Sequence, residues 1–305
     1  RKVGIVGISH TRFGRWDGSF IDLCCTAAVE ALEDAGMRDG SVGVDQLLLS
    51  TMGAQVLNHQ SAAATALVDT LNLRPAMAET VENGPASGAS AVKFAYTAIA
   101  SGLCDVVLVI GAEMMRAVDS KKRTELVASL LHPEVEYPYG LTLPAMAGMF
   151  TRLYMERYGV TGEDLALVAI KNHRHAMLNP LAQFHTELTL NQLLGADAKN
   201  PRVAEPLRLY DVCPTSDGAA ALVLCAMEVA ECFSRKPVVI SGIGQATDTH
   251  TVAERELPVE LAAVRIAAKR AYDMSGLAPE DIDVAELHDA FTILEIAESE
   301  EVGFF

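Results

Sequence analysis

One pattern of strand and helix occurs twice in this chain of 305 residues, and the repeat limits the folds that the chain can adopt. Residues 3–8 (VGIVGI) resemble residues 238–243 (VVISGI), and the unbroken apolar character of each run is typical of a buried strand. An alanine-rich helical stretch follows each run and ends at a glycine, Gly36 in the first copy and Gly276 in the second. Both stretches then lead into a Val-Asp or Ile-Asp step and a further strand. The repeat predicts a duplicated α/β unit, with the two copies about 235–240 residues apart.

Strand-like and helical runs alternate through the first copy and beyond it. We expect strands at residues 3–8, 46–50, 77–82, 104–110 and 216–226, and helices at residues 22–35, 61–71, 144–157 and 162–172. Such alternation predicts the α/β class, in which helices cover the faces of a sheet.

The two copies are unequal in length. The N-terminal half is expected to comprise residues 1–115 together with residues 213–235, which include its closing strand. Residues 116–212 form a long insertion, rich in His, Pro, Met and charged side chains, that we expect to act as a loop or lid. The C-terminal half begins near residue 236 and continues to residue 305, after its second strand and next helix. We expect this half to be incomplete, with an unpaired strand edge in its sheet.

Charge and hydropathy exclude two kinds of partner. The chain has 40 Asp and Glu against 24 Lys and Arg, and its formal net charge of −16 is spread along the sequence, so we expect no nucleic-acid partner. No apolar run reaches roughly 18 residues, so we expect no membrane-spanning helix. The six cysteines follow no disulfide or zinc spacing, which predicts no metal site and favours a reducing cytoplasm.

The segment at residues 81–114 holds the most informative turn of the chain. A strand runs into the sequence Asn-Gly-Pro, a helix of small residues follows, and a fully apolar strand comes next. We expect Gly84 to permit a sharp turn and Pro85 to occupy the first helical position, where its missing N–H costs nothing. The N–H groups after Pro85 would then form a positive helix end that can bind a developing oxyanion. They belong to Ala86, Ser87 and Gly88.

Six blocks in order resemble the thiolase superfamily, most of all the sterol-carrier-protein-type thiolases and their bacterial and archaeal relatives. The blocks are residues 81–88 with 105–114, 140–144, 171–173 with 179–180, 206–210, 216–221 and 286–291. The resemblance implies a duplicated, layered αβαβα fold and a homodimer formed near residues 77–81. It also implies that the substrate is a coenzyme A thioester, that no cofactor is covalently bound, and that the bond made or broken is the carbon–carbon bond next to the thioester.

Carried over by position, the catalytic pattern of that superfamily is only partly present. The nucleophilic cysteine of VE-x-x-C-A-S-G matches Pro85, so a covalent acyl-enzyme at this position is excluded. Ser87 could replace it as nucleophile or could simply begin the helix. His288 matches the histidine of His-Asp-Ala-Phe, which implies an oxyanion donor, although it could also be an ordinary cap of a helix at residues 290–303. Asp289 is expected to cap that helix or to position the loop. Cys213 lies near a position where relatives line the pantetheine path, and an ordinary packing role is the alternative.

Three functions remain open at this stage. The first is retro-aldol cleavage of a β-hydroxyacyl-CoA, as in thiolase-like steroid side-chain aldolases that lack the cysteine and work with a DUF35 partner. Those relatives are expected to carry a tyrosine near position 288, so His288 counts against this function. The second is thiolase or acyltransferase chemistry on a β-ketoacyl-CoA, and the third is a non-catalytic subunit. Candidate bases in the insertion are His132, Tyr137, Tyr139, His173, His175 and His185.

Overall fold

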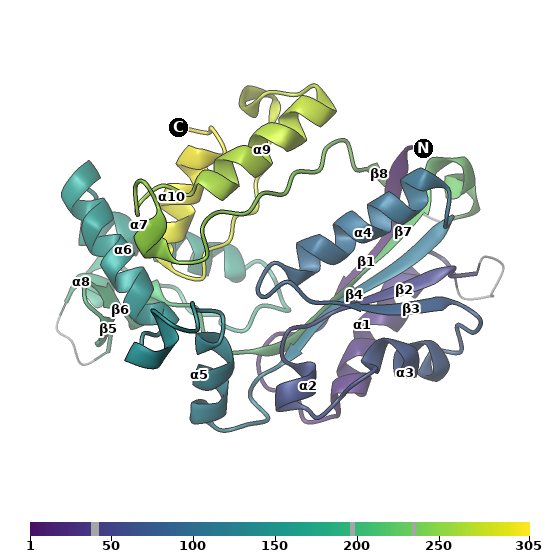
Figure 1. Ribbon diagram of the computed structural model, residues 1–305, viewed down its shortest axis with the longest axis horizontal. Helices are drawn as coiled ribbons and strands as arrows, with labels where there is room; N and C mark the ends of the chain where they lie inside the picture. The colour runs from purple at the N-terminus through teal and green to yellow at the C-terminus, as the bar shows by residue number, and fades with distance from the viewer. Residues whose placement is uncertain (38–42, 196–198, 234–235) are drawn as a thin grey trace. The chain divides into compact units, whose positions relative to one another are not determined.

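The computed structural model describes residues 1–37, 43–195, 199–233 and 236–305. These residues divide into two compact units (Figure 1). The first unit comprises Arg1–Arg123 and Thr215–Ile240, and the second comprises Thr124–Pro214 and Ser241–Phe305.

The first unit is built on a six-stranded sheet with the order β3-β2-β4-β7-β1-β8. The strands are β1 (Val3–His10), β2 (Gln46–Ser50), β3 (Met77–Val81), β4 (Val106–Met114), β7 (Asp217–Ala226) and β8 (Val238–Val239). Strand β2 pairs in parallel with β3 and β4, whereas β7 is antiparallel to both β4 and β1. Strands β1 to β4 therefore all run in one direction, and their carboxyl ends share one edge of the sheet, where α/β proteins commonly bind ligands.

Helices cover both faces of this sheet (Figure 1). They are α1 (Phe20–Asp34), α2 (Ala54–Leu57), α3 (Ala63–Thr70) and α4 (Ser87–Ser101). Leu47 and Leu49 of β2 belong to the apolar cluster that contains α1 and α3, and Leu48 between them belongs to the cluster that contains α4. This alternation along one strand is what a sheet buried on both faces requires.

The second unit is mainly helical. Its helices are α6 (Leu143–Tyr158), α7 (Gly162–Ala176), α8 (Leu190–Leu194), α9 (Ala262–Ser275) and α10 (Thr292–Glu301), and β5 (Arg202–Ala204) pairs with β6 (Leu207–Arg208). Helix α5 (Ser120–Ala128) contains the boundary between the units. Short 3₁₀ turns lie at Tyr137–Tyr139, Leu209–Asp211, Met227–Cys232, Val252–Glu254 and Pro279–Asp281. Phe150, Tyr154, Leu165 and Ile293 form the apolar core that joins α6, α7 and α10.

All five strands and four helices expected above are present, with ends that differ by a few residues. The first helix illustrates why the prediction succeeded. Ser19 and Asp22 form a reciprocal capping box at its start, and Gly36 follows its last turn with φ of 83°. Both signals are local, so they can be recognised from the sequence without knowledge of tertiary contacts.

Corresponding glycines of the repeat make the same close packing contact in the two units. A Cβ added to Gly7 would lie 2.3 Å from the carbonyl oxygen of Ala31 on α1. A Cβ added to Gly242 would lie 2.2 Å from the carbonyl oxygen of Ala271 on α9. Each glycine thus lets an extended segment lie directly against its helix. The shared contact supports the duplication inferred from the sequence.

The strands expected in the second copy differ from the structure. Of residues 238–243, only β8 is a strand, and it pairs antiparallel with β1 in the sheet of the first unit. Residues 282–289 are not a strand either, although the Ile-Asp step was expected to lead into one. A strand needs a neighbour to accept its backbone hydrogen bonds, and within the described part of the second unit neither stretch has one. The repeat therefore predicted the course of the chain here but not its sheet pairing.

Candidate functional site

The turn before α4 is organised differently from the sequence expectation. Helix α4 begins at Ser87 with Ala86 as its N-cap, so Pro85 lies outside the helix rather than at its first position. The reason is a hydrogen-bonded turn, in which the Ala86 N–H donates to the Asn83 carbonyl (3.1 Å) and the Ser87 N–H donates to the Gly84 carbonyl (3.2 Å). Gly84 has φ of 53°, a left-handed conformation that glycine adopts without strain.

The Ser87 hydroxyl holds this turn closed. Its Oγ accepts from the Asn83 N–H at 2.7 Å and donates to the Gly84 carbonyl at 2.6 Å, and the residue is buried. The Asn83 side chain donates in turn to Ser90 Oγ at 2.9 Å. Because the Ser87 proton is already committed to a carbonyl, the structural interpretation of Ser87 is favoured over a nucleophilic one.

The free N–H groups at the start of α4 are not the three that were expected. Those of Ala86 and Ser87 are used within the turn. In the part of the chain that the structure describes, no acceptor is found for the N–H groups of Gly88 and Ala89. The first turn of a helix normally leaves such donors available, and the helix dipole favours an anion beside them. The N–H groups that remain available to an anion are therefore those of Gly88 and Ala89, and their role as oxyanion donors stays a prediction.

A pocket of about 310 Å³ lies beside this turn, and we call it the Pro85 pocket. It is lined by Phe13, Ser50, Met52, Gly84, Pro85, Ser87, Gly88, Gly111, Ala112, Glu113, Ser216, Gly218, Ala219 and Ala220. All of these residues belong to the first unit, and most lie at or next to the carboxyl ends of β1 to β4 or at the start of β7. The pocket thus lies at the edge of the sheet that the carboxyl ends of β1 to β4 share.

Glu113 on β4 is a residue of this pocket that the sequence analysis missed. Its carboxylate accepts hydrogen bonds from the Thr51 hydroxyl and from the N–H groups of Met52 and Gly53. Burial raises the pKa of Glu113, and the N–H donors of Met52 and Gly53 act in the opposite direction. Glu113 therefore fixes the loop that follows β2, which forms part of the pocket wall.

Phe13, which lines the pocket, and Asp217, which lies between the lining residues Ser216 and Gly218, were also missed, because they are far from the α4 turn in sequence. The buried carboxylate of Asp217 accepts from the N–H groups of Trp16 (3.0 Å) and Arg116 (2.7 Å). The Phe13 ring covers Gly218, where an added Cβ would lie 2.4 Å from the ring. The antiparallel pairing of β7 with β1 and with β4 brings these segments together.

His288 lies in the second unit and is exposed. Its backbone N–H donates to Glu298 Oε2 at 3.0 Å. Helix α10 has Phe291 as its N-cap, so the interpretations of His288 and Asp289 as helix caps are both wrong. The imidazole has no hydrogen bond to another described residue, which leaves it available to a ligand. The catalytic role of His288 stays a prediction.

Cys213 lines a second pocket, of about 470 Å³, in the second unit. We call it the aromatic pocket and define it by Asn172, His173, Phe184, Tyr210, Cys213 and Asp289. The Asp289 carboxylate accepts from the Asn172 side chain at 2.6 Å, in agreement with a role in positioning the loop. Burial, followed by the charge of Asp289, raises the pKa of Cys213. Of the candidate bases, His173 lines this pocket, and the proximity of Cys213 to pantetheine stays a prediction.

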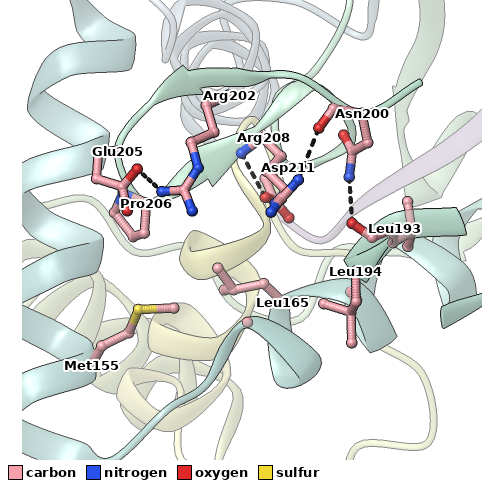
Figure 2. Close-up of a pocket in the computed structure, with 12 residues that line it drawn as sticks. Met155, Leu165, Leu193, Leu194, Asn200, Arg202, Glu205, Pro206, Arg208 and Asp211 are labelled. Carbon is pink, nitrogen blue, oxygen red and sulfur yellow. Dashed lines mark hydrogen bonds and ion pairs between the residues drawn. The ribbon is translucent and has the colours of Figure 1, made fainter. Parts of the chain in front are cut away.

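A further pocket of about 230 Å³ in the same unit has polar groups that already bind one another (Figure 2). Arg202 forms an ion pair with Glu205, and the Arg208 backbone N–H donates to Asp211 at 2.8 Å. The Asn200 side chain donates to the Leu193 carbonyl at 2.9 Å. Because these contacts satisfy the groups concerned, we assign them to holding the β5–β6 hairpin against α8.

Two kinds of feature are absent from the part of the chain that the structure describes. Among the described residues, no three His, Cys, Asp or Glu side chains are grouped so that they could hold a metal ion. In the same residues, every helix is too short or too polar to cross a membrane.

Comparison with protein families identifies matches over nearly the whole chain. Residues 3–228 match the family described as "Thiolase, N-terminal domain", and residues 244–305 match "Thiolase C-terminal domain-like". The chain is 36% identical over 305 residues to "Acetyl-CoA acetyltransferase" of Methanothermobacter thermautotrophicus, covering 100% of this chain and 78% of that protein. It is 32% identical over 320 residues to "Steroid side-chain-cleaving aldolase" of Thermomonospora curvata, covering 98% and 77%.

Among solved structures, one similar to the chain is described as "Ltp2-ChsH2(DUF35) aldolase". The TM-score is 0.81 and the sequence identity is 29%, with 100% of this chain and 77% of that chain covered. Structures with about 20% identity, including human mitochondrial 3-ketoacyl-CoA thiolase, share the fold as well.

Proposed function

The chain belongs to the thiolase superfamily, and from this premise we propose that it cleaves a β-hydroxyacyl-CoA by a retro-aldol reaction without a covalent intermediate. That the chain is a thiolase-superfamily enzyme follows from the family matches. The observation that carries the retro-aldol proposal is Pro85, a residue without a nucleophile, in the wall of a pocket beside free N–H donors.

Covalent acyl transfer needs an activated nucleophile. The Ser87 hydroxyl donates to a carbonyl, as described above. Burial raises the pKa of the thiols of Cys24, Cys25, Cys104 and Cys225, so the reactive thiolate is disfavoured at each. These groups do not support a covalent acyl-enzyme.

A retro-aldol reaction requires no such group. A base removes the proton of the β-hydroxyl, the Cα–Cβ bond breaks, and a ketone or aldehyde is released. The electron pair of that bond moves into the enolate of the shortened thioester, which then takes up a proton at Cα. We propose that the N–H groups of Gly88 and Ala89 stabilise the enolate oxygen. The catalytic role of His288, an exposed residue of the second unit, is a separate proposal.

We also propose a protein partner, a homodimer contact, a substrate class and a cellular compartment for the enzyme. The name of the similar aldolase structure includes a DUF35 component, which supports a partner of that type for this chain. Strand β3 is an edge strand of the sheet and is the expected contact of a homodimer. We propose that the substrate is a coenzyme A thioester that is not covalently attached to the protein. The six cysteines form no disulfide, which suits a reducing cytoplasm.

A second function, thiolase-type acyl transfer to or from a β-ketoacyl-CoA, is favoured by one observation. The archaeal acetyl-CoA acetyltransferase has a higher identity, 36%, than the steroid aldolase, 32%. This reaction would need attack by coenzyme A directly on the substrate, because Pro85 cannot accept the acyl group.

The test is product analysis with purified protein, alone and with a DUF35 partner. We expect β-hydroxyacyl-CoA to yield a ketone or aldehyde together with the shortened acyl-CoA. Consumption of a β-ketoacyl-CoA only in the presence of free coenzyme A would instead support the acyltransferase. A partner that is fully active without this chain would assign it a non-catalytic role.

A further inference from the structure

One buried hydroxyl in the wall of the Pro85 pocket has no partner in the described part of the chain. Ser50 is the last residue of β2, is only 4% exposed and lines the pocket. Its Oγ makes no hydrogen bond to another described residue. It is also not one of the fully enclosed side-chain atoms without a partner, so it keeps contact with the open space of the pocket. Buried hydroxyl groups are normally hydrogen-bonded, so this one needs a partner that enters the pocket.

The other hydroxyl groups that line this pocket are already engaged. Ser87 donates to the Gly84 carbonyl, as described above, and Ser216 interacts with another residue. Within the described lining of the pocket, Ser50 thus carries the hydroxyl that remains available to a ligand.

Ser50 faces the start of α4 across open space. A Cβ added to Gly88 would lie 3.9 Å from Ser50 Oγ. Apart from the chain neighbours of Gly88 and its own helix, no other heavy atom of the described residues would lie within 4 Å of that Cβ. The Gly88 N–H is one of the two free donors at this helix start. A hydroxyl and an N–H group that border one space can both donate to a single oxygen atom between them.

The surroundings of Ser50 favour a donor over a nucleophile. A serine attacks a thioester efficiently only when an adjacent base takes its proton. Glu113 is the carboxylate of the pocket lining, and its oxygens accept from the Thr51 hydroxyl and from two backbone N–H groups. Ser50 makes no hydrogen bond to this carboxylate, so its proton stays on the hydroxyl and can be donated to a ligand oxygen.

We propose that Ser50 is a catalytic residue, whose hydroxyl donates to the thioester oxygen together with the Gly88 N–H and stabilises the enolate. The inference rests on the proposed function, because it concerns the same reacting atoms. When the Cα–Cβ bond breaks, its electron pair moves towards this oxygen, and the two hydrogen bonds strengthen as negative charge develops there. The Ser50 proton remains on its Oγ throughout. Both donors belong to the first unit.

Thermal stability distinguishes this role from a structural one. Because the Ser50 hydroxyl has no partner in the described part of the protein, its removal should cost no hydrogen bond. We expect Ser50→Ala to unfold at the same temperature as the wild type or at a higher one. Ser87→Ala is the matched control from the same pocket, and it should unfold at a lower temperature because it loses two hydrogen bonds. A lower melting temperature of Ser50→Ala would assign Ser50 a structural role.

Binding of three coenzyme A compounds tests the role directly, by calorimetric titration of the wild type and Ser50→Ala. Carboxymethyl-CoA carries a negatively charged oxygen near the position of the thioester oxygen, acetyl-CoA carries a neutral carbonyl, and free coenzyme A carries neither. We expect Ser50→Ala to weaken carboxymethyl-CoA about tenfold, acetyl-CoA about threefold and free coenzyme A less than about twofold. Ser101 is exposed at the far end of α4, so Ser101→Ala should change none of the three affinities.

A second variant tests the space beside Ser50. Gly88→Ala places a methyl group in that space at 3.9 Å from Ser50 Oγ, which is an ordinary contact distance. The variant should fold, since alanine favours a helix more than glycine does. We expect it to weaken carboxymethyl-CoA and acetyl-CoA but not free coenzyme A. Unchanged binding of all three would show that no ligand oxygen occupies this space.

Other results would reject the inference in distinguishable ways. If carboxymethyl-CoA and acetyl-CoA bind equally well to the wild type and to Ser50→Ala, the role of Ser50 is wrong while the proposed function stands. If none of the three compounds binds to the wild type, the proposed function fails and the inference fails with it. An acyl group recovered on the Ser50 peptide would make Ser50 a nucleophile instead of a donor.

Discussion

At the scale of single residues, Pro85 offers no nucleophile at its own position, and its neighbours determine which backbone N–H groups a ligand can reach. The sequence resemblance matched Pro85 to the superfamily's cysteine and predicted Pro85 at the first helical position, whereas α4 begins two residues later, at Ser87. The actual start of α4 depends on two turn hydrogen bonds, to the carbonyls of Asn83 and Gly84, which no composition rule reveals. The same contacts remove the N–H groups of Ala86 and Ser87 from the set of available donors.

A thiol introduced at position 85 should make covalent chemistry possible. In Pro85→Cys the new side chain would lie in the wall of the Pro85 pocket, just before the positive end of α4, a setting that lowers a thiol pKa. We expect this variant to become acylated by an acyl-CoA, seen as a mass increase of the intact protein. Pro85→Ser and the wild type are the controls and should stay unlabelled. Labelling of the wild type to the same extent would show that another residue is the nucleophile.

Glu113 should make stability depend on pH. Burial raises its pKa above the ordinary value of 4.5, so the folded state binds the proton more tightly than the unfolded state. The corresponding stabilisation is present below pH 4.5 and is lost as the pH rises through the raised pKa. Relative to Glu113→Gln, the unfolding free energy of the wild type should therefore fall with rising pH. Urea unfolding at several pH values measures this free energy for both proteins. If the wild type and Glu113→Gln depend on pH in the same way, the proposed effect of Glu113 is wrong.

At the scale of helices and strands, local sequence signals were sufficient to predict an element wherever its own residues stabilise it. The capping box of α1 and the apolar run of β4 are examples. The stretches at 238–243 and 282–289 have a comparable composition, yet only Val238 and Val239 pair. Strand formation depends on a neighbour, so strand content in the second unit could not be predicted from the segments themselves.

The repeated glycine contact gives a prediction at this scale. Gly7→Ala and Gly242→Ala each place a Cβ within 2.3 Å of a helix carbonyl, and backbone cannot move away cheaply. We expect each substitution to lower the unfolding free energy by about 1–3 kcal/mol. Gly43→Ala is the control, because its Cβ would have no neighbour within 4 Å. Urea unfolding measures all three, and equal stability of the three variants would reject the proposed packing equivalence.

At the scale of the whole molecule, the order of the blocks along the chain was enough to predict the thiolase fold, which the family matches confirm. The residues that line the Pro85 pocket were harder to predict from the sequence. Phe13, Glu113 and Gly218 reach it only because β1, β4 and β7 are neighbours in the sheet. Sequence separation hides such contacts until the strand order is known.

The homodimer belongs to this scale. Met77 begins the edge strand β3 and is 41% exposed, so a dimer formed along this edge would cover it. We expect the wild type to sediment as a dimer at micromolar concentration and Met77→Lys to shift it towards the monomer. Leu103→Lys, at an exposed position outside β3, should leave the dimer intact. A monomeric wild type would contradict the proposal.

The most direct test of the central claim is the intact mass of the protein during turnover of a β-hydroxyacyl-CoA. We expect ketone or aldehyde to be released at a steady rate while the mass of the wild-type chain stays unchanged at every time point. An acyl adduct that forms and decays at the rate of product release would contradict it, because the reaction would then proceed through a covalent intermediate that Pro85 cannot form.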